Sequence, residues 1–232
     1  MTKRPVFDEL AKVYDAWFLT PEGEKVFSLE LRTLLSIVEP KPGMRMLDVG
    51  IGTGVFAAEF RRLGVDVVGL DPSPEMRKIA GRRGFEVSEG FGEAIPYGDG
   101  LFDIVLAMTS LEFATDRLRF VDEMARVAAP GGIVAIGALN KWSLYGLSRS
   151  AKKLSGKTTY SAAHFYSGPE LARTMRRFLD KVRITSSVFF GPNPNAFALR
   201  RSEGIERVGE MCPYPLGALL VGKGIKRSKR GE

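Results

Sequence analysis

Apolar and polar positions alternate along the middle of the chain in a way that predicts a parallel sheet covered by helices. Short apolar runs typical of buried strands span residues 46–49, 65–71, 85–90, 102–107 and 132–139. Segments with apolar side chains at helical spacing separate these runs, and two of the predicted helices end at Gly64 and Gly84. Because the connections are short, we expect parallel strands joined by right-handed crossovers.

Two helices are predicted ahead of the sheet, over residues 5–18 and 21–39. Thr20 suits the N-cap of the second helix, and Pro21 suits its first turn because a helix start needs no N–H there. Together the two helices are expected to form a helical cap over residues 1–40.

Beyond the middle of the chain, the pattern predicts a helix near residues 117–128 and a strand near 182–190. A short helix near 202–211 and a last strand near 217–224 follow. Asp116 suits the N-cap of the first, and Ser167 with Glu170 forms a capping box for another helix. Residues 140–167 make a connection too long for a plain loop. Long connections tend to be functional, so we expect a lid-like insertion there.

A glycine turn follows the first predicted strand. Gly50, Gly52 and Gly54 stand at spacing two, directly before a helical stretch that begins at Val55. Glycine tolerates positive φ and has no Cβ, so the backbone can press against a ligand whose polar end meets the free amides of the helix start. A dinucleotide fingerprint requires a third glycine where Val55 stands, and NAD is therefore disfavoured.

Two carboxylates beside this turn indicate the kind of ligand. Asp71 ends the second strand about 20 residues after the first glycine, where a carboxylate can accept both hydroxyls of a ribose. Asp48 lies at the tip of the first strand, where it would repel a pyrophosphate and suit an ammonium group. A nucleoside carrying an amino acid fits these two residues better than a nucleotide does.

The series "LDVGIGTG", "VVGLDPSPEM", "GFGEAIPYGDGLFDIVLA" and "PGGIVAIGAL" resembles the motifs of class I S-adenosylmethionine-dependent methyltransferases, over roughly residues 40–140. The nearest resemblance is to the ubiquinone/menaquinone-methyltransferase-like group, which acts on small molecules. It implies an α/β, Rossmann-like three-layer sandwich with helices on both faces of a seven-stranded, mostly parallel sheet. The implied strand order is 3-2-1-4-5-7-6, with the last strand antiparallel, in a single domain over residues 1–232.

The resemblance also implies a cofactor, S-adenosylmethionine, and its product S-adenosylhomocysteine. The residues expected to bind this cofactor are Asp48, Gly50, Gly52, Gly54, Asp71, Pro72, Gly92, Glu93 and Met108. Related sequences usually have Gly-Asp-Ala where this chain places Phe91 and Gly92. We therefore expect backbone groups of Gly92 and Glu93 to bind adenine, and the Phe91 ring to lie against the base.

On the acceptor side, the resemblance implies that the "YDAWF" segment folds over the cofactor. The residues expected to line the acceptor site are Tyr14, Trp17, Phe18, Glu112, Trp142 and His164. An aromatic stripe on a helix fits a core role equally well. His164, the only histidine, is the candidate general base, with a structural role as the alternative, and no metal site is expected.

Composition and charge narrow the class of protein. A chain of 232 residues with one cysteine, Cys212, excludes an internal disulfide and is compatible with a reducing cytoplasm. No export signal or membrane-spanning run is expected, and a cytoplasmic location is predicted. The chain has 34 Lys+Arg and 27 Asp+Glu. Residues 1–116 contain 13 basic and 19 acidic side chains, and the remainder contains 21 basic and 8 acidic ones.

The positive second half suits an anionic acceptor, a membrane surface or nucleic acid, although solvated faces and a basic tail explain it as well. A small-molecule methyl acceptor is the favoured partner, with an anionic acceptor left open, and nucleic acid is disfavoured. The alternatives are an RNA-modifying methyltransferase and a non-catalytic S-adenosylmethionine-binding protein. The accepting atom and the oligomeric state do not follow from the residues.

Overall fold

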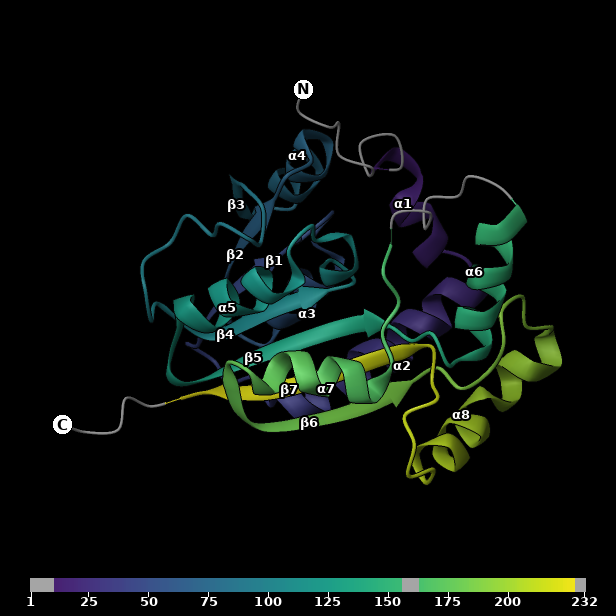
Figure 1. Ribbon diagram of the computed structural model, residues 1–232. Helices are drawn as coiled ribbons and strands as arrows, with labels where there is room; N and C mark the ends of the chain where they lie inside the picture. Colours follow the sequence, from purple (N-terminus) through teal and green to yellow (C-terminus); the bar gives the residue numbers. More distant parts are fainter. Residues whose placement is uncertain (1–10, 156–162, 228–232) are drawn as a thin grey trace.

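The computed structural model describes residues 11–155 and 163–227, and a seven-stranded sheet runs through this part of the chain (Figure 1). The strands are β1 (Arg45–Val49), β2 (Asp66–Asp71), β3 (Glu86–Glu89), β4 (Phe102–Met108), β5 (Ala128–Leu139), β6 (Leu179–Ser187) and β7 (Leu219–Lys226). Their order is β3-β2-β1-β4-β5-β7-β6, and β7 pairs antiparallel with both of its neighbours. The predicted order and the antiparallel last strand are confirmed.

Helices lie on both faces of this sheet. They are α1 (Ala11–Phe18), α2 (Pro21–Val38), α3 (Val55–Arg62), α4 (Pro74–Arg82), α5 (Arg117–Val127), α6 (Leu144–Ser155), α7 (Gly168–Arg176) and α8 (Ala196–Glu210), with a 3₁₀ turn η1 (Leu111–Phe113). The predicted caps are confirmed: Thr20 and Asp116 accept backbone N–H groups of α2 and α5, and both halves of the Ser167–Glu170 capping box are present.

Two apolar layers hold the sandwich together. On one face, Phe120 and Met124 of α5 and Met175 of α7 pack against the sheet. On the other, Leu34 of α2 and Phe60 of α3 do so. Figure 1 shows α5 and α7 in front of the strands and α2 and α3 behind them. The carboxyl ends of the parallel strands therefore meet at one edge between these layers, where ligands bind in open α/β sheets.

Several predicted boundaries differ from the structure, most clearly those of β5 and α8. β5 begins at Ala128, four residues before the strand predicted over 132–139, and includes the Pro-Gly-Gly segment. Its register against β4 shifts between Phe102 and Ile104, so the segment is absorbed as an irregularity of the strand. α8 begins at Ala196, well before the short helix expected near residues 202–211, because Asn195 caps it by accepting the Ala198 N–H.

Parts of the predicted cap and lid, residues 1–10 and 156–162, lie outside the described residues. Among the helices that are described, none combines the length and the apolar composition that crossing a membrane requires.

Candidate functional site

The glycine turn after β1 has positive φ at all three glycines, 80° at Gly50, 58° at Gly52 and 82° at Gly54. A Cβ added at Gly50 would lie 2.5 Å from the Ser110 Cβ, and one at Gly54 would lie 2.9 Å from the Phe85 ring. A Cβ added at Gly52 would meet nothing within 4 Å. Gly50 and Gly54 are therefore needed for packing inside the protein, while Gly52 borders open space that a ligand can approach.

Asp71 joins the ends of β1 and β2. Its Oδ2 accepts the Gly52 N–H at 2.8 Å and its Oδ1 accepts the Ser73 N–H at 2.8 Å. The side chain is buried at the carboxyl end of β2. The predicted ribose acceptor is thus held rigidly beside the glycine turn, and Pro72 follows it, half-buried, with its carbonyl bound by Arg77.

Asp48 lies on β1 with only 2% of its surface exposed. Its Oδ1 is buried and has no hydrogen-bond partner among the residues that the structure describes. Burial, and then the charge of Asp71, raise the pKa of Asp48 to about 7. A buried oxygen without a partner is unfavourable, and a ligand cation would relieve it.

In the connection between β3 and β4, Gly92 and the side chain of Glu93 are used for contacts within the protein. A Cβ at Gly92 would lie 2.1 Å from the Phe120 ring, so glycine lets this segment pack on α5. The Glu93 carboxylate accepts the Thr115 N–H at 2.7 Å, and its carbonyl accepts Arg119 Nε at 2.8 Å. The contact of the backbone of Gly92 and Glu93 with adenine stays a prediction, and the exposed ring of Phe91 lies next to this segment.

The helix α1 is fastened to the glycine turn by residues that sequence reasoning missed. Asp15 Oδ1 accepts the Thr53 hydroxyl at 2.7 Å, and Asp15 Oδ2 pairs with Arg83 Nη2 at 2.6 Å. Arg83 also donates to the Thr53 carbonyl. The only sequence signal was the position of Asp15 inside "YDAWF", because its partners lie 38 and 68 residues away.

The three predicted aromatic residues of α1 have different surroundings. Phe18 packs edge-on against Phe27 of α2, with 5.6 Å between ring centroids, and Tyr14 lies 5.5 Å from Phe18. Trp17 also contacts Phe18 but is 41% exposed. Phe18 thus belongs to a stack that continues to α2, whereas Trp17 reaches the surface.

On the acceptor side, Glu112 of η1 joins three segments. Its Oε1 accepts the Leu139 N–H at 2.6 Å, and its carbonyl accepts the His164 N–H at 2.9 Å. The side chain is 1% exposed, and its Oε2 is without a hydrogen-bond partner in the described part of the chain. Burial raises the pKa of Glu112 to about 7, although the Leu139 amide works in the opposite direction.

His164 lies directly beside Glu112 in the fold. Its Nε2 is 2.6 Å from Glu170 Oε1, and its ring packs edge-on against Tyr166 at 4.8 Å. Burial acts to raise the pKa of Glu170, but hydrogen bonds from Lys141 and His164 outweigh it and lower the pKa. The structure therefore brings the backbones of His164 and Glu112 together, whereas the His164 ring pairs with Glu170.

Met108 and Trp142 are placed differently. Met108 ends β4, buried, and packs its sulfur over Gly137 of β5. Trp142 is 51% exposed, and its backbone N–H donates to Asn140 Oδ1 at 3.0 Å.

The helix α6 turns charged and polar groups inward, a feature that the sequence pattern did not reveal. The Tyr145 hydroxyl donates to Glu22 Oε1 of α2 at 2.6 Å, and the Arg149 guanidinium lies 5.3 Å from the centre of the Tyr145 ring. Burial raises the pKa of Glu30, on α2, to about 7, while the charge of Arg149 lowers it. Arg149 acts on Glu112 in the same way, so it lies within electrostatic reach of both carboxyls.

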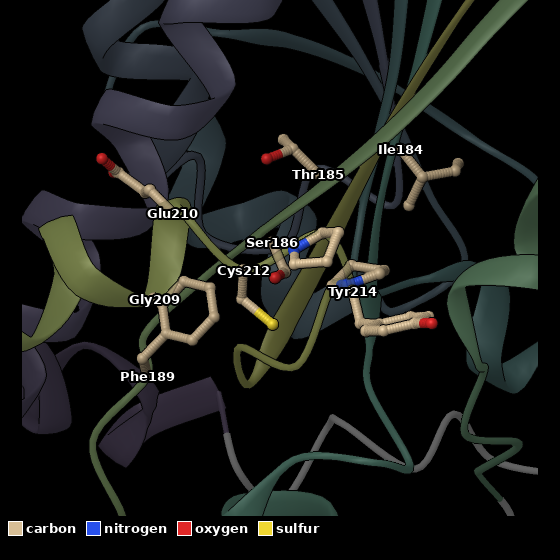
Figure 2. A pocket seen from close by; sticks show the side chains of 10 residues that line it. Ile184, Thr185, Ser186, Phe189, Gly209, Glu210, Cys212 and Tyr214 are labelled. Carbon is tan, nitrogen blue, oxygen red and sulfur yellow. The ribbon is translucent and has the colours of Figure 1, made fainter.

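A separate small pocket lies between β6 and the segment after α8 (Figure 2). Its volume is about 70 Å³, and its walls include Thr185, Cys212 and Tyr214. It contains none of the predicted site residues, and it is too small for a nucleoside, since sites for such ligands span roughly 300–1,000 Å³.

Comparison with known proteins agrees with this geometry. A family model described as a methyltransferase domain matches residues 47–136. An uncharacterized protein of Methanocaldococcus jannaschii, MJ1123, is 35% identical over 79% of this chain and 85% of its own. A Thermotoga maritima S-adenosylmethionine-dependent methyltransferase of known structure is 27% identical, with a TM-score of 0.78 over 96% of this chain and 99% of its own. The chain belongs to the class I S-adenosylmethionine-dependent methyltransferases.

Other relatives of this methyltransferase match less of the chain or only its fold. A ubiquinone biosynthesis O-methyltransferase of Bradyrhizobium is 38% identical over 46% of this chain and 44% of its own. The chain spans 56% of the length of an uncharacterized Mycobacterium tuberculosis relative, at 34% identity. A Haloferax volcanii methyltransferase in complex with the activator Trm112 shares the fold, with a TM-score of 0.73 at 19% identity.

S-adenosylmethionine is the cofactor of this methyltransferase, and the residues at the turn fit it. Gly52 borders open space, the buried Oδ1 of Asp48 is suited to an ammonium group, and Asp71 presents a carboxylate at the end of β2. These features match the backbone approach, the amino-acid end and the ribose of the cofactor.

Proposed function

We propose that this enzyme methylates a small-molecule acceptor that binds at the carboxyl ends of β4 and β5, against η1 and α6. The observation that carries the proposal is Glu112, a buried carboxyl group with one oxygen fixed on Leu139 and the other without a partner among the described residues. Ser110, two residues earlier, donates to the Val49 carbonyl at 2.7 Å and contacts Gly50. Glu112 therefore lies two residues from a side chain that contacts the cofactor turn.

Glu112 is proposed to take the proton that the acceptor loses. S-adenosylmethionine, when bound, supplies an electrophilic methyl group, and the protein supplies alignment, exclusion of water and a proton acceptor. A carboxyl group with a pKa of about 7 suits removal of a proton from an N–H or O–H group near neutral pH. His164, held by Glu170, is the second candidate for this role.

The names of related proteins support an acceptor that carries such a proton. The Thermotoga protein is a possible histamine N-methyltransferase, and a Haemonchus contortus neighbour of the fold is a phosphoethanolamine N-methyltransferase. The Bradyrhizobium relative is an O-methyltransferase. Amines and hydroxyls both lose a proton on methylation, so Glu112 is equally useful for either.

Entry of the acceptor requires a movement, because Glu112 is 1% exposed. We propose that α6 opens as part of the lid over residues 140–167. The hydroxyl of Tyr145 holds α6 to Glu22 of α2, and the charge of Arg149 acts on Glu30 of the same helix. Opening of α6 exchanges these polar interactions for interactions with water.

The test measures release of S-adenosylhomocysteine with an acceptor screen of primary amines, phosphorylated amines and phenols. With a confirmed acceptor, Glu112→Gln should lower kcat about 100-fold or more while cofactor affinity stays unchanged, because a general base acts only in the transfer step. Glu86→Gln, an exposed carboxyl at the start of β3 and therefore far from the carboxyl ends of the strands, is the matched control. Equal turnover of Glu112→Gln and wild type would contradict the role of Glu112, and no turnover with any acceptor would favour the non-catalytic binder.

A further inference from the structure

The helix α8 exposes large apolar side chains to solvent and buries a carboxylate against the protein. Phe197, Ile205 and Val208 follow one outward stripe, with 59%, 36% and 71% of their surfaces exposed. On the inner side, Glu206 is completely buried and accepts the Val188 and Phe189 N–H groups. The stripe continues past the helix with exposed side chains, namely Met211, Tyr214 and Leu216.

The helix α6 also exposes apolar side chains to solvent and turns polar ones toward the protein. Leu144 and Leu147 are 59% and 62% exposed and Ala151 is exposed, at positions that share one face. Tyr145 and Arg149 point the other way, toward the carboxyls of α2. Figure 1 shows α6 and α8 at the same end of the molecule, beyond the carboxyl ends of the strands. The Leu144 side chain also approaches Gly191, just before α8.

Arginines border this apolar surface. Arg200, Arg201 and Arg207 of α8 are exposed, and the Arg201 guanidinium lies 4.5 Å from the centre of the Phe197 ring. The three carboxyls of α8 have other partners or are buried: Glu203 pairs with Lys25 and Arg32, Glu210 pairs with Arg32 at 3.6 Å, and Glu206 is buried. The outward face therefore combines large apolar groups with uncompensated positive charge.

We propose that the outward faces of α6 and α8 dock this enzyme on an anionic lipid surface. Helices with apolar side chains on one face and arginine beside them lie in the membrane interface, with the apolar groups at the acyl boundary and the guanidinium groups on phosphates. A symmetric contact with a second copy would place the same arginines against each other, which costs free energy. A lipid surface supplies the complementary charge instead.

Vesicle flotation of the full chain tests this proposal, with neutral phosphatidylcholine vesicles and vesicles that also contain phosphatidylglycerol. Wild type should float with the anionic vesicles and much less with the neutral ones. Val208→Asp with Met211→Asp should weaken partitioning about tenfold or more, because two apolar anchors are lost and negative charge is added. Both residues are highly exposed, so the variant should fold normally, which its thermal unfolding checks.

Two controls separate this surface from other sources of binding. Leu63→Asp changes an exposed leucine at the end of α3, near the start of β2 and thus at the opposite edge of the sheet, and should bind as wild type does. Lys229→Gln with Arg230→Gln removes charge from the C-terminal tail and should also leave binding intact. Equal loss in Leu63→Asp, complete loss in the tail variant, or equal binding to neutral vesicles would overturn the proposal. A dimer in sedimentation that Val208→Asp disrupts, without lipid binding, would do so as well.

Discussion

The buried carboxyl of Asp48 should make cofactor affinity depend on pH. Burial and the charge of Asp71 hold its pKa at about 7 in the free protein, so about half of the molecules carry it ionised at pH 7 and about 3% at pH 5.5. The ammonium of S-adenosylmethionine prefers the ionised form. Binding therefore releases a proton, and affinity should rise with pH until it levels off above the pKa.

The size of the effect follows from these fractions. Between pH 5.5 and pH 7.0 the ionised fraction rises about 15-fold, so the dissociation constant should fall by about the same factor, which is about 1.6 kcal/mol. The upper limit of pH 7.0 keeps an α-amino group, with a pKa of about 7.7–8.0, mostly protonated.

Calorimetric titration at several pH values measures this dependence, and buffers with different ionisation enthalpies count the released proton. Asp48→Asn should bind more weakly at pH 7 and lose most of the slope, because an amide does not titrate in this range. Asp66→Asn, at the exposed start of β2, should keep the wild-type slope. A flat wild-type profile, or a slope that persists in Asp48→Asn, would refute the reasoning.

Further outcomes are expected at the cofactor and acceptor sides. Asp71→Ala should weaken cofactor binding by roughly 1.5 to 3 kcal/mol in calorimetry, because the ribose hydroxyls and the Gly52 amide lose a charged acceptor, and equal affinity would sink the assignment. The raised pKa of Glu112 means that the unfolded state, with a carboxyl pKa near 4.5, loses its proton first, so stability falls as pH rises from about 5 to 7. In wild type, chemical denaturation should show a loss of up to about 3 kcal/mol in the free energy of unfolding over this pH range. Glu112→Gln should lack this loss, and an unchanged pH profile in the variant would argue against the raised pKa of Glu112. His164→Ala should lower kcat and alter its pH profile, whereas a rise in KM alone would assign the histidine to packing.

Local pattern was sufficient for much of the cofactor side. The glycine turn lies between an apolar run and a helix, Asp71 ends the next run, and the caps at Thr20, Asp116 and Ser167 precede helical spacing. Each of these features depends on residues within a few positions of one another, because strand period, helix period and capping are short-range effects. The place of β7 between β5 and β6 came from family resemblance, since no local pattern encodes which strands pair.

The acceptor side and the surface depended on long-range contacts. Asp15 meets Arg83 across 68 residues, and Glu112 acquires its raised pKa only where β4, β5 and the segment of His164 enclose it. The sequence pattern predicted no helix over α6 and only the second part of α8, and periodicity does not show whether an apolar stripe faces the core or the solvent. Burial is a property of the assembled fold, because whether a side chain loses contact with water depends on residues distant in the chain. The outward orientation of Leu147 and Val208 therefore appears only in the structure.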